Sequence, residues 1–203
     1  MTGAAPEQAA SFAFTPENRA KAEQLIAKYP RGRQASAVLA VLDLAQRQSG
    51  GWLPRAAMEH VAALLDMPLI HVQEIATFYT MFNMRPVGRR LIQLCRTTPC
   101  WLRGSDGIRD ACMKRLGIGI GETTADGEFT LVEVECLAAC VNAPVVQIND
   151  DYYEDLTPPK MVEIIDRLAR GERPPHGSQI ERQFSAPVGG LTTLTASSEA
   201  EKG

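Results

Sequence analysis

Two close pairs of cysteines constrain this chain more than any other feature of its sequence. Cys95 and Cys100 form a C-x4-C pair, and Cys136 and Cys140 form a C-x3-C pair, while Cys112 stands alone. Because the first basic residue is Arg19, we expect neither a secretory leader nor a transit peptide. An odd number of cysteines in a reducing compartment argues against a disulfide framework. The two pairs instead predict a metal site.

Each cysteine pair follows a predicted β-strand. The apolar run 91–94 leads into Cys95, and the alternating segment 129–135 leads into Cys136. We expect each pair to lie in the loop after its strand. The segment between the pairs is long enough for a helix and a return strand, so the four thiolates can meet at one end of a sheet.

The sequence changes character near residue 88, which predicts an α+β chain in several parts. Residues 15–84 carry four amphipathic patterns with brief connections and should form an N-terminal four-helix bundle. Residues 85–172 mix strands and helices in a small α/β domain of thioredoxin-like size. Residues 1–14 are weakly patterned and should form a loose terminus, and residues 173–203 have the composition of a tail. We interpret the apolar cluster Phe78, Tyr79, Met81 and Phe82 as core.

Spacing alone leaves three roles open for four converging thiolates. Structural zinc sites use cysteine pairs separated by two to four residues. A [2Fe-2S] cluster also takes four cysteines, and a C-x4-C spacing opens the ligand run of plant-type clusters. Thiol–disulfide chemistry is less favoured because neither pair has the C-x-x-C spacing. Cys112 falls on the apolar stripe of a predicted helix, which is typical of a core cysteine.

Charge is distributed unevenly around the cysteines. Residues 85–115 contain eight Lys or Arg and two acids, whereas residues 116–155 contain nine acids and no Lys or Arg. The simplest interpretation is two solvated faces. Alternatively the charges set the environment of an anionic cluster, with Arg96 and Arg103 favouring its reduction and Glu133 and Glu135 opposing it. The net charge of −3 and the pI of about 5.7 give no support to nucleic-acid binding.

Nothing in the sequence predicts an acid–base or nucleophilic active site. His60, His71 and His176 form no triad-like pattern with a serine, cysteine or carboxylate. An electron-transfer site needs neither group, because its cofactor carries the chemistry. The sequence also contains no apolar run of the roughly 18 residues that a membrane span requires.

Several segments identify a family resemblance that covers about residues 12–195. They are Thr77-Phe-Tyr-Thr-Met-Phe-Asn83, Pro86-Val-Gly88, Cys95-Arg-Thr-Thr-Pro-Cys100, Val134-Glu-Cys-Leu-Ala-Ala-Cys-Val-Asn-Ala-Pro144 and Gln147-Ile-Asn-Asp-Asp-Tyr-Tyr-Glu-Asp-Leu156. Together they resemble the two-iron subunit in the peripheral arm of NADH:quinone oxidoreductase, respiratory complex I.

The resemblance implies a thioredoxin-like ferredoxin domain over 85–172, with one [2Fe-2S] cluster held by Cys95, Cys100, Cys136 and Cys140. It further implies an electron-transfer subunit without a complete active site of its own, in a proton-translocating enzyme. The implied partners are a flavoprotein subunit that binds FMN and NADH, and further iron–sulfur subunits. The implied location is peripheral, on the cytoplasmic face of a bacterial inner membrane or the matrix side in a mitochondrion.

Residues 173–203 then become an extended C-terminal arm, because the segments 182–185 and 187–194 resemble the family's C-terminal extension. We expect this arm to order against a partner subunit. Two alternatives remain. One is the equivalent diaphorase subunit of an NAD-linked hydrogenase or formate dehydrogenase, and the other is a zinc-stabilised interaction module.

Overall fold

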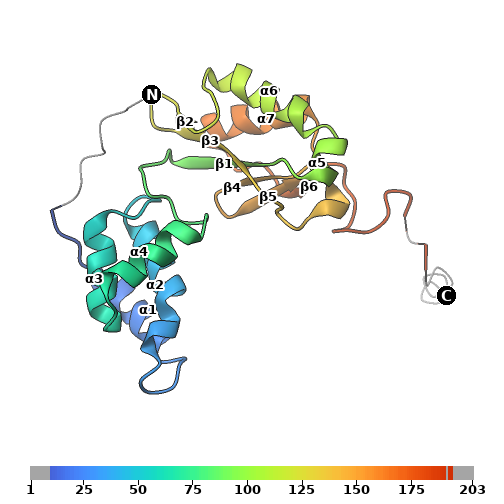
Figure 1. Cartoon of the computed structure of the whole chain (residues 1–203). Helices are drawn as coiled ribbons and strands as arrows, with labels where there is room; N and C mark the ends of the chain where they lie inside the picture. Colours follow the sequence, from blue (N-terminus) through green and yellow to red (C-terminus); the bar gives the residue numbers. More distant parts are fainter. Residues whose placement is uncertain (1–9, 191, 194–203) are drawn as a thin grey trace. The chain divides into compact units, whose positions relative to one another are not determined.

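The computed structural model describes residues 10–190 and 192–193, in two compact units that divide between Arg89 and Arg90 (Figure 1). The boundary expected at 84/85 lies five residues earlier. Residues 1–9 of the expected loose terminus, and residues 191 and 194–203 of the expected arm, lie outside the described part of the chain. No helix in the described part is both long and apolar enough to span a bilayer.

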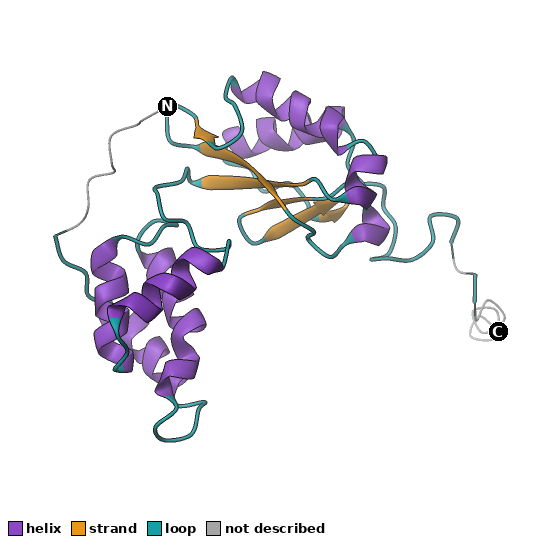
Figure 2. Ribbon diagram, viewed as in Figure 1, coloured by secondary structure: helices purple, strands orange, loops and turns teal. Residues whose placement is uncertain are grey.

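Unit 1 consists of helices (Figure 2). They are α1 (Pro16–Ile26), the 3₁₀ turn η1 (Gln34–Ala37), α2 (Val38–Gln48), α3 (Arg55–Leu65) and α4 (Leu69–Phe78). The hydroxyl of Thr15 caps α1 by accepting a hydrogen bond from the N–H of Asn18, and Pro16 occupies the first turn, where its missing N–H costs nothing. The apolar stripes of the helices meet in one core that includes Val41, Leu42 and Val61.

Three of the four aromatic and methionine residues that we interpreted as core are exposed. Phe82 is buried, but Phe78 is 77% exposed, and Tyr79 and Met81 are 41% and 51% exposed. Helix α4 ends at Phe78, so Tyr79 and Met81 lie beyond it, and Phe78 itself lies on the helix face opposite the buried Ala76. The interpretation was therefore wrong for Phe78, Tyr79 and Met81.

Unit 2 is built on a six-stranded mixed sheet. Its strands are β1 (Arg90–Cys95), β2 (Glu122–Thr123), β3 (Phe129–Val134), β4 (Val146–Ile148), β5 (Asp151–Glu154) and β6 (Gly177–Ser178). The strand order is β2-β3-β1-β4-β5-β6. Strands β1 and β3 are parallel, with Cys95 opposite Val134, whereas β4 runs antiparallel to β1 and to β5. Parallel pairing places the carboxyl ends of β1 and β3 at one edge of the sheet.

Two helices cover one side of this sheet, α6 (Ser105–Leu116) and α7 (Pro158–Ala169) (Figure 2). Helix α7 carries a strong apolar stripe, and its Met161 and Ile164 are buried in one cluster with residues of β1 and β3. Cys112 of α6 is fully buried in the same cluster, which confirms its prediction as a core cysteine.

Several elements were not predicted, among them the short strand β2, the turn η2 (Cys140–Asn142) and two elements that bear on the sheet. A short helix, α5 (Thr98–Leu102), follows β1 closely. Strand β6 comes from the segment expected to be a tail, and it pairs with β5 in parallel register. The mixed α+β fold class is confirmed, and the sheet extends beyond residue 172.

Candidate metal centre

The two cysteine pairs lie at the edge of the sheet where β1 and β3 end. Cys95 is the last residue of β1, and Cys136 follows β3 by two residues. Cys100 lies in helix α5 and Cys140 opens the 3₁₀ turn η2 (Cys140–Asn142). The expectation that each pair lies in the loop after its strand was therefore wrong for Cys95, which ends β1, and for Cys100 and Cys140, whose segments form short helical turns.

Packing brings the two cysteine segments together. Cys95 and Cys100 are buried in a small cluster with Ala143 and Val145, and Leu137 packs partly buried against it. The N–H of Cys95 also donates a hydrogen bond of 3.3 Å to the carbonyl of Val145. The segment that carries the second cysteine pair therefore folds over the first pair.

The second pair lies at the surface. Cys136 and Cys140 are both exposed, and their sulfur atoms are 3.4 Å apart. The N–H of Ala138 donates a 3.3 Å hydrogen bond to the sulfur of Cys136. Ala138 adopts a left-handed backbone conformation with φ of 62°, and its N–H points back toward the preceding cysteine.

The first pair contains one thiol of lowered and one of raised pKa. Burial acts to raise the pKa of Cys95, but hydrogen bonds from the Thr97 hydroxyl and from the backbone of Leu137 outweigh it, so the pKa is lowered. The Thr97 hydroxyl lies 3.3 Å from the Cys95 sulfur. Burial and the hydrogen bond with Cys95 raise the pKa of Cys100 to about 12, and the charge of Cys140 contributes in the same direction.

The second pair also contains one thiol of lowered pKa and one of raised pKa. The hydrogen bond from the Ala138 N–H lowers the pKa of Cys136, and the neighbouring Cys140 lowers it further. The pKa of Cys140 is raised, chiefly by its hydrogen bond with Cys136. The charge of Cys95 acts to raise the pKa of both Cys136 and Cys140. The two pairs are thus close enough to interact electrostatically.

The donor set fits two metal ions held by one cysteine pair each. A metal–thiolate bond of about 2.3 Å and a tetrahedral angle place two sulfurs on one metal about 3.8 Å apart, close to the 3.4 Å between Cys136 and Cys140. Within residues 10–190 and 192–193, no three His, Cys, Asp or Glu side chains converge where a single ion could bind them. A [2Fe-2S] cluster takes its four cysteine ligands as two pairs, one for each iron.

The uneven charges of the sequence meet in space because β1 lies beside β3. Arg96 forms a 2.6 Å ion pair with Glu133, which Arg109 also approaches at 3.9 Å. Arg90 pairs with Glu128 at the other end of the two strands. The basic and acidic segments therefore neutralise each other across this strand pair.

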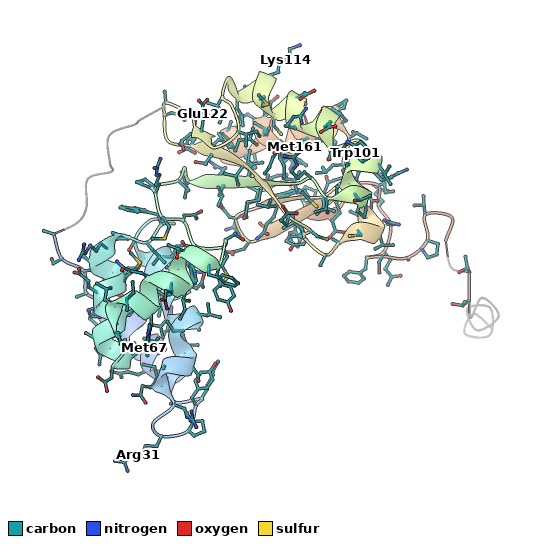
Figure 3. The ribbon with its side chains drawn as sticks, viewed as in Figure 1. Arg31, Met67, Trp101, Lys114, Glu122 and Met161 are labelled. Atoms are coloured by element: carbon teal, nitrogen blue, oxygen red, sulfur yellow. The ribbon has the colours of Figure 1, made fainter. Side chains whose placement is uncertain are left out.

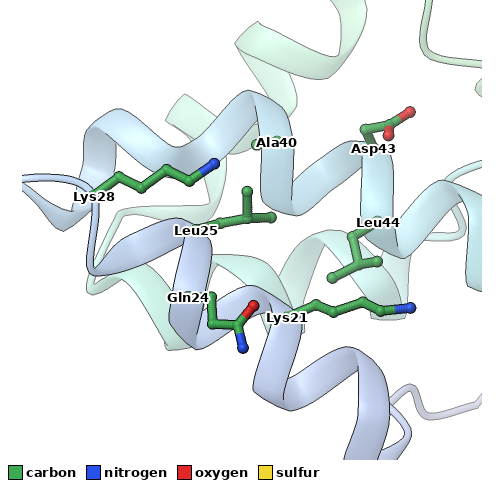
Figure 4. A pocket seen from close by; sticks show the side chains of 7 residues that line it. All are labelled: Lys21, Gln24, Leu25, Lys28, Ala40, Asp43 and Leu44. Atoms are coloured by element: carbon green, nitrogen blue, oxygen red, sulfur yellow. The ribbon is translucent and has the colours of Figure 1, made fainter.

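Two further features belong to the helical unit. A pocket of about 330 Å³ on unit 1 is lined by Lys21, Gln24, Leu25, Lys28, Ala40, Asp43 and Leu44 (Figure 4). It contains no cysteine and lies between α1 and α2. His60 packs against the rings of Phe12 and Phe14 and belongs to unit 1.

Sequence reasoning did not predict the apolar residues beside the centre. Trp101 and Leu102 follow Cys100 and are 57% and 71% exposed, and Val141 follows Cys140 and is 62% exposed. Phe184 is 84% exposed, and its carbonyl accepts a hydrogen bond from the Asn142 side chain near the same end of the sheet. We call these four residues the apolar rim; Trp101 lies at the α5 end of the sheet in Figure 3. A signal was present, because large apolar residues directly follow two cysteines.

The family of thioredoxin-like [2Fe-2S] ferredoxins matches residues 22–169, more than half of the sequence. The chain belongs to this family. Its cofactor is accordingly one [2Fe-2S] cluster, which removes the zinc alternative.

Comparison with individual proteins agrees with this assignment. A subunit of the NADH-quinone oxidoreductase of Rickettsia bellii is 61% identical over 158 residues, which cover 78% of this chain and 95% of that protein. The mitochondrial NADH dehydrogenase (ubiquinone) flavoprotein 2 of Dictyostelium discoideum is 48% identical over 183 residues, covering 90% of this chain and 74% of that protein. These relatives confirm the resemblance to the two-iron subunit of NADH:quinone oxidoreductase.

A solved structure shares the fold. The air-oxidized NAD⁺-reducing [NiFe]-hydrogenase has a TM-score of 0.56 and 20% identity over a region that covers 63% of this chain and 22% of that chain. At this level of identity the likeness concerns the fold alone.

Proposed function

We propose that this chain is the electron-transfer subunit of an NADH:quinone oxidoreductase, with Cys95, Cys100, Cys136 and Cys140 as the ligands of its [2Fe-2S] cluster. The observation that carries the proposal is the convergence of two cysteine pairs at one edge of the sheet, one pair buried and the other exposed. A [2Fe-2S] cluster takes up and releases one electron at a time.

The protein residues hold and shield such a cluster asymmetrically. Cys95 and Cys100 lie in an apolar cluster with Val145, which excludes water from the inner pair. Hydrogen bonds from Thr97 and Ala138 reach the sulfurs of Cys95 and Cys136. Hydrogen bonds to ligand sulfurs stabilise negative charge there and raise the reduction potential.

The exposed pair leaves one side of the centre open to a partner. The apolar rim residues directly follow Cys100 and Cys140 or bind the turn η2, and exposed apolar side chains are typical of protein–protein contact sites. We infer that a flavoprotein subunit that binds FMN and NADH docks on the rim, and that single electrons pass between its flavin and this centre. The FMN and NADH sites belong to that partner.

In this proposal the chain is a non-autonomous subunit of a proton-translocating oxidoreductase. It would work together with further iron–sulfur subunits, as a peripheral component on the cytoplasmic face of a bacterial inner membrane. The identity of 59–61% to NADH-quinone oxidoreductase subunits of several Rickettsia species favours this function over the diaphorase subunit of a hydrogenase or formate dehydrogenase.

The ligand assignment is tested by iron analysis and EPR on the purified full chain, before and after dithionite reduction. We expect two irons per chain, no signal when oxidised, and about one spin with an average g value below about 2 when reduced. Cys136→Ser should lose iron or change the signal, whereas Cys112→Ala, the matched control, should retain both. A Cys136→Ser variant with the wild-type spectrum would contradict the assignment.

The docking surface is tested by co-purification with the flavoprotein subunit. Leu102→Ser should weaken the complex because it removes an exposed apolar contact on the rim. Ile70→Ser is the control for a general loss of surface hydrophobicity, because Ile70 lies on the helical unit and is 57% exposed. Equal binding by wild type and Leu102→Ser would argue against docking at this rim.

A further inference from the structure

The C-terminal segment carries an arginine whose charge is buried. Arg182 and Asp155 form an ion pair in which the side chains are only 8% and 9% exposed. The contact is bidentate, because the Nε and Nη2 atoms of Arg182 each donate a 2.9 Å hydrogen bond to a different carboxylate oxygen of Asp155. Such a two-pronged contact fixes the guanidinium plane as well as its distance.

The same guanidinium also binds the turn that follows Cys140. The two N–H groups of its Nη2 are shared among Asp155, the carbonyl of Val141 at 2.7 Å and the side-chain oxygen of Asn142. Its Nη1 donates to the carbonyl of Ala186. One side chain therefore joins the residue after β5, the C-terminal segment and the turn η2, which starts with a proposed cluster ligand.

Asn142 completes the network from the other direction. It is 3% exposed, and its Nδ2 donates to the Phe184 carbonyl at 2.9 Å and to the Glu154 carboxylate. Its backbone carbonyl accepts a 2.7 Å hydrogen bond from the N–H of Asp155. The polar groups of Asn142 are thus bound by residues 154–155 on one side and by the C-terminal segment on the other. Arg182 contacts Asp155 on the first side and Ala186 on the second.

The backbone around Arg182 adopts an uncommon conformation. Asp155, Glu181 and Phe184 all have positive φ values, of 54°, 61° and 46°. Non-glycine residues rarely adopt this conformation, and it persists where surrounding contacts impose it. The segment on either side of Arg182 is thus held in a conformation that local sequence preference alone would not select.

We propose that Arg182 is a positioning residue for the ligand Cys140. By binding Asp155, Val141 and Asn142 together, it fixes the turn η2 and so holds the Cys140 sulfur beside that of Cys136, where both can bind one iron. This inference rests on the proposed function, because it takes Cys140 to be a ligand. It also changes the expectation for the arm, whose residues 177–186 bind their own domain.

A different explanation is that the ion pair only stabilises the fold. Variants of this chain can distinguish stabilisation from positioning. A buried ion pair can often be replaced by apolar residues without loss of stability, whereas removal of one partner leaves an unpaired buried charge. Replacing both partners therefore separates charge compensation from positioning, because it removes the unpaired charge but does not restore the donors to Val141 and Asn142.

The experiment measures the rate at which the full-length, cluster-loaded chain loses its cluster to an iron chelator, from the bleaching of its visible absorption. Arg182→Met should lose the cluster about 10–100-fold faster, because removal of an outer-shell partner typically weakens metal binding by that factor and we assign the loss to the release rate. The double variant Arg182→Met/Asp155→Leu should remain fast. Arg170→Met, which removes an exposed ion pair with Glu172, is the matched control and should lose its cluster at the wild-type rate.

EPR of the reduced chain adds a readout that a general loss of stability would not move. We expect changed g values in Arg182→Met and wild-type g values in Arg170→Met. A wild-type rate and spectrum in Arg182→Met, or return of the wild-type rate in the double variant, would overturn the proposal. If Arg182→Met does not fold, Arg182→Lys decides, since lysine keeps the charge but cannot contact all three partners; a wild-type rate in that variant would also overturn it.

A Cys140→Ser variant tests the ligand assignment separately from the positioning role of Arg182. Loss of iron or a changed spectrum in Cys140→Ser, together with wild-type behaviour of Arg182→Met, would reject the positioning role alone. A wild-type spectrum in Cys140→Ser would instead reject the ligand assignment, and the positioning role with it.

Discussion

The ion pair between Arg96 and Glu133 makes the reduction potential of the centre a quantitative test of its electrostatics. Arg96 directly follows the proposed ligand Cys95, and its guanidinium lies 2.6 Å from the Glu133 carboxylate. Reduction adds one negative charge to the cluster, so a nearby carboxylate disfavours it and a nearby guanidinium favours it. Glu133→Gln removes the carboxylate charge and leaves Arg96 uncompensated, which should raise the potential.

The expected size follows from Coulomb's law. A unit charge about 10 Å from the centre contributes about 0.4–1.7 kcal/mol for effective dielectric constants between about 80 and 20. Since about 1.4 kcal/mol corresponds to about 59 mV for one electron, Glu133→Gln should raise the midpoint potential by about 20–70 mV. Glu133 is only 18% exposed, so salt should screen this effect weakly.

The assay is a potentiometric titration of the full chain, followed by the EPR signal of the reduced state at low and high salt. Glu135→Gln is the comparison, because Glu135 adjoins Cys136 but is exposed. Glu135→Gln should also raise the midpoint potential, and this rise should decrease more with increasing salt concentration than the rise in Glu133→Gln. A potential that falls or stays unchanged in Glu133→Gln would refute the assignment of these charges to the environment of the centre.

Two further predictions concern groups outside the centre, the buried Cys112 and the half-buried His60. Because Cys112 is fully buried and burial raises its pKa to about 12, it should resist alkylation by iodoacetamide at a pH of about 8 in the folded chain. Mass spectrometry should find it unmodified until the chain unfolds, and rapid labelling would contradict its burial. Burial beside Phe12 and Phe14, with a smaller effect of Arg19, lowers the pKa of His60. The unfolded chain then binds a proton at higher pH than the folded chain, so the melting temperature should fall as the pH drops through about 6.5, and a His60→Leu variant that kept the full wild-type dependence would disprove this.

The meeting of the cysteine segments at one sheet edge could be predicted from the sequence because its signals are local. Each cysteine pair is a short motif at the end of a recognisable apolar strand, and parallel strands bring their carboxyl ends together. The helices of unit 1 could be predicted equally well, since Pro16 and Pro54 mark where α1 and α3 begin. Local patterns of this kind do not depend on the rest of the fold.

The features that sequence reasoning missed depend on distant contacts. Arg182 binds Asp155 across 27 residues and Val141 across 41 residues, and no periodicity connects these positions. Tyr79 shows another limit, because it continues the spacing of Val72 and Ala76 but lies one residue beyond the end of α4 and is exposed. An apolar side chain at the end of a helix has the same sequence pattern whether it faces its own core or solvent, and only the position of the helix end decides.

The placement of the two cysteine pairs where two strands end would also give the cluster a mechanical role. Cys100 and Cys136 lie 36 positions apart, with α6, β2 and β3 between them. With the four proposed ligands bound, the cluster is a crosslink that closes this stretch into a loop, and by analogy with a disulfide of that span it disfavours the unfolded chain by about 4 kcal/mol. The cluster that takes up the electron would then also crosslink the chain. Loss of iron would therefore remove the redox centre and destabilise the domain at the same time.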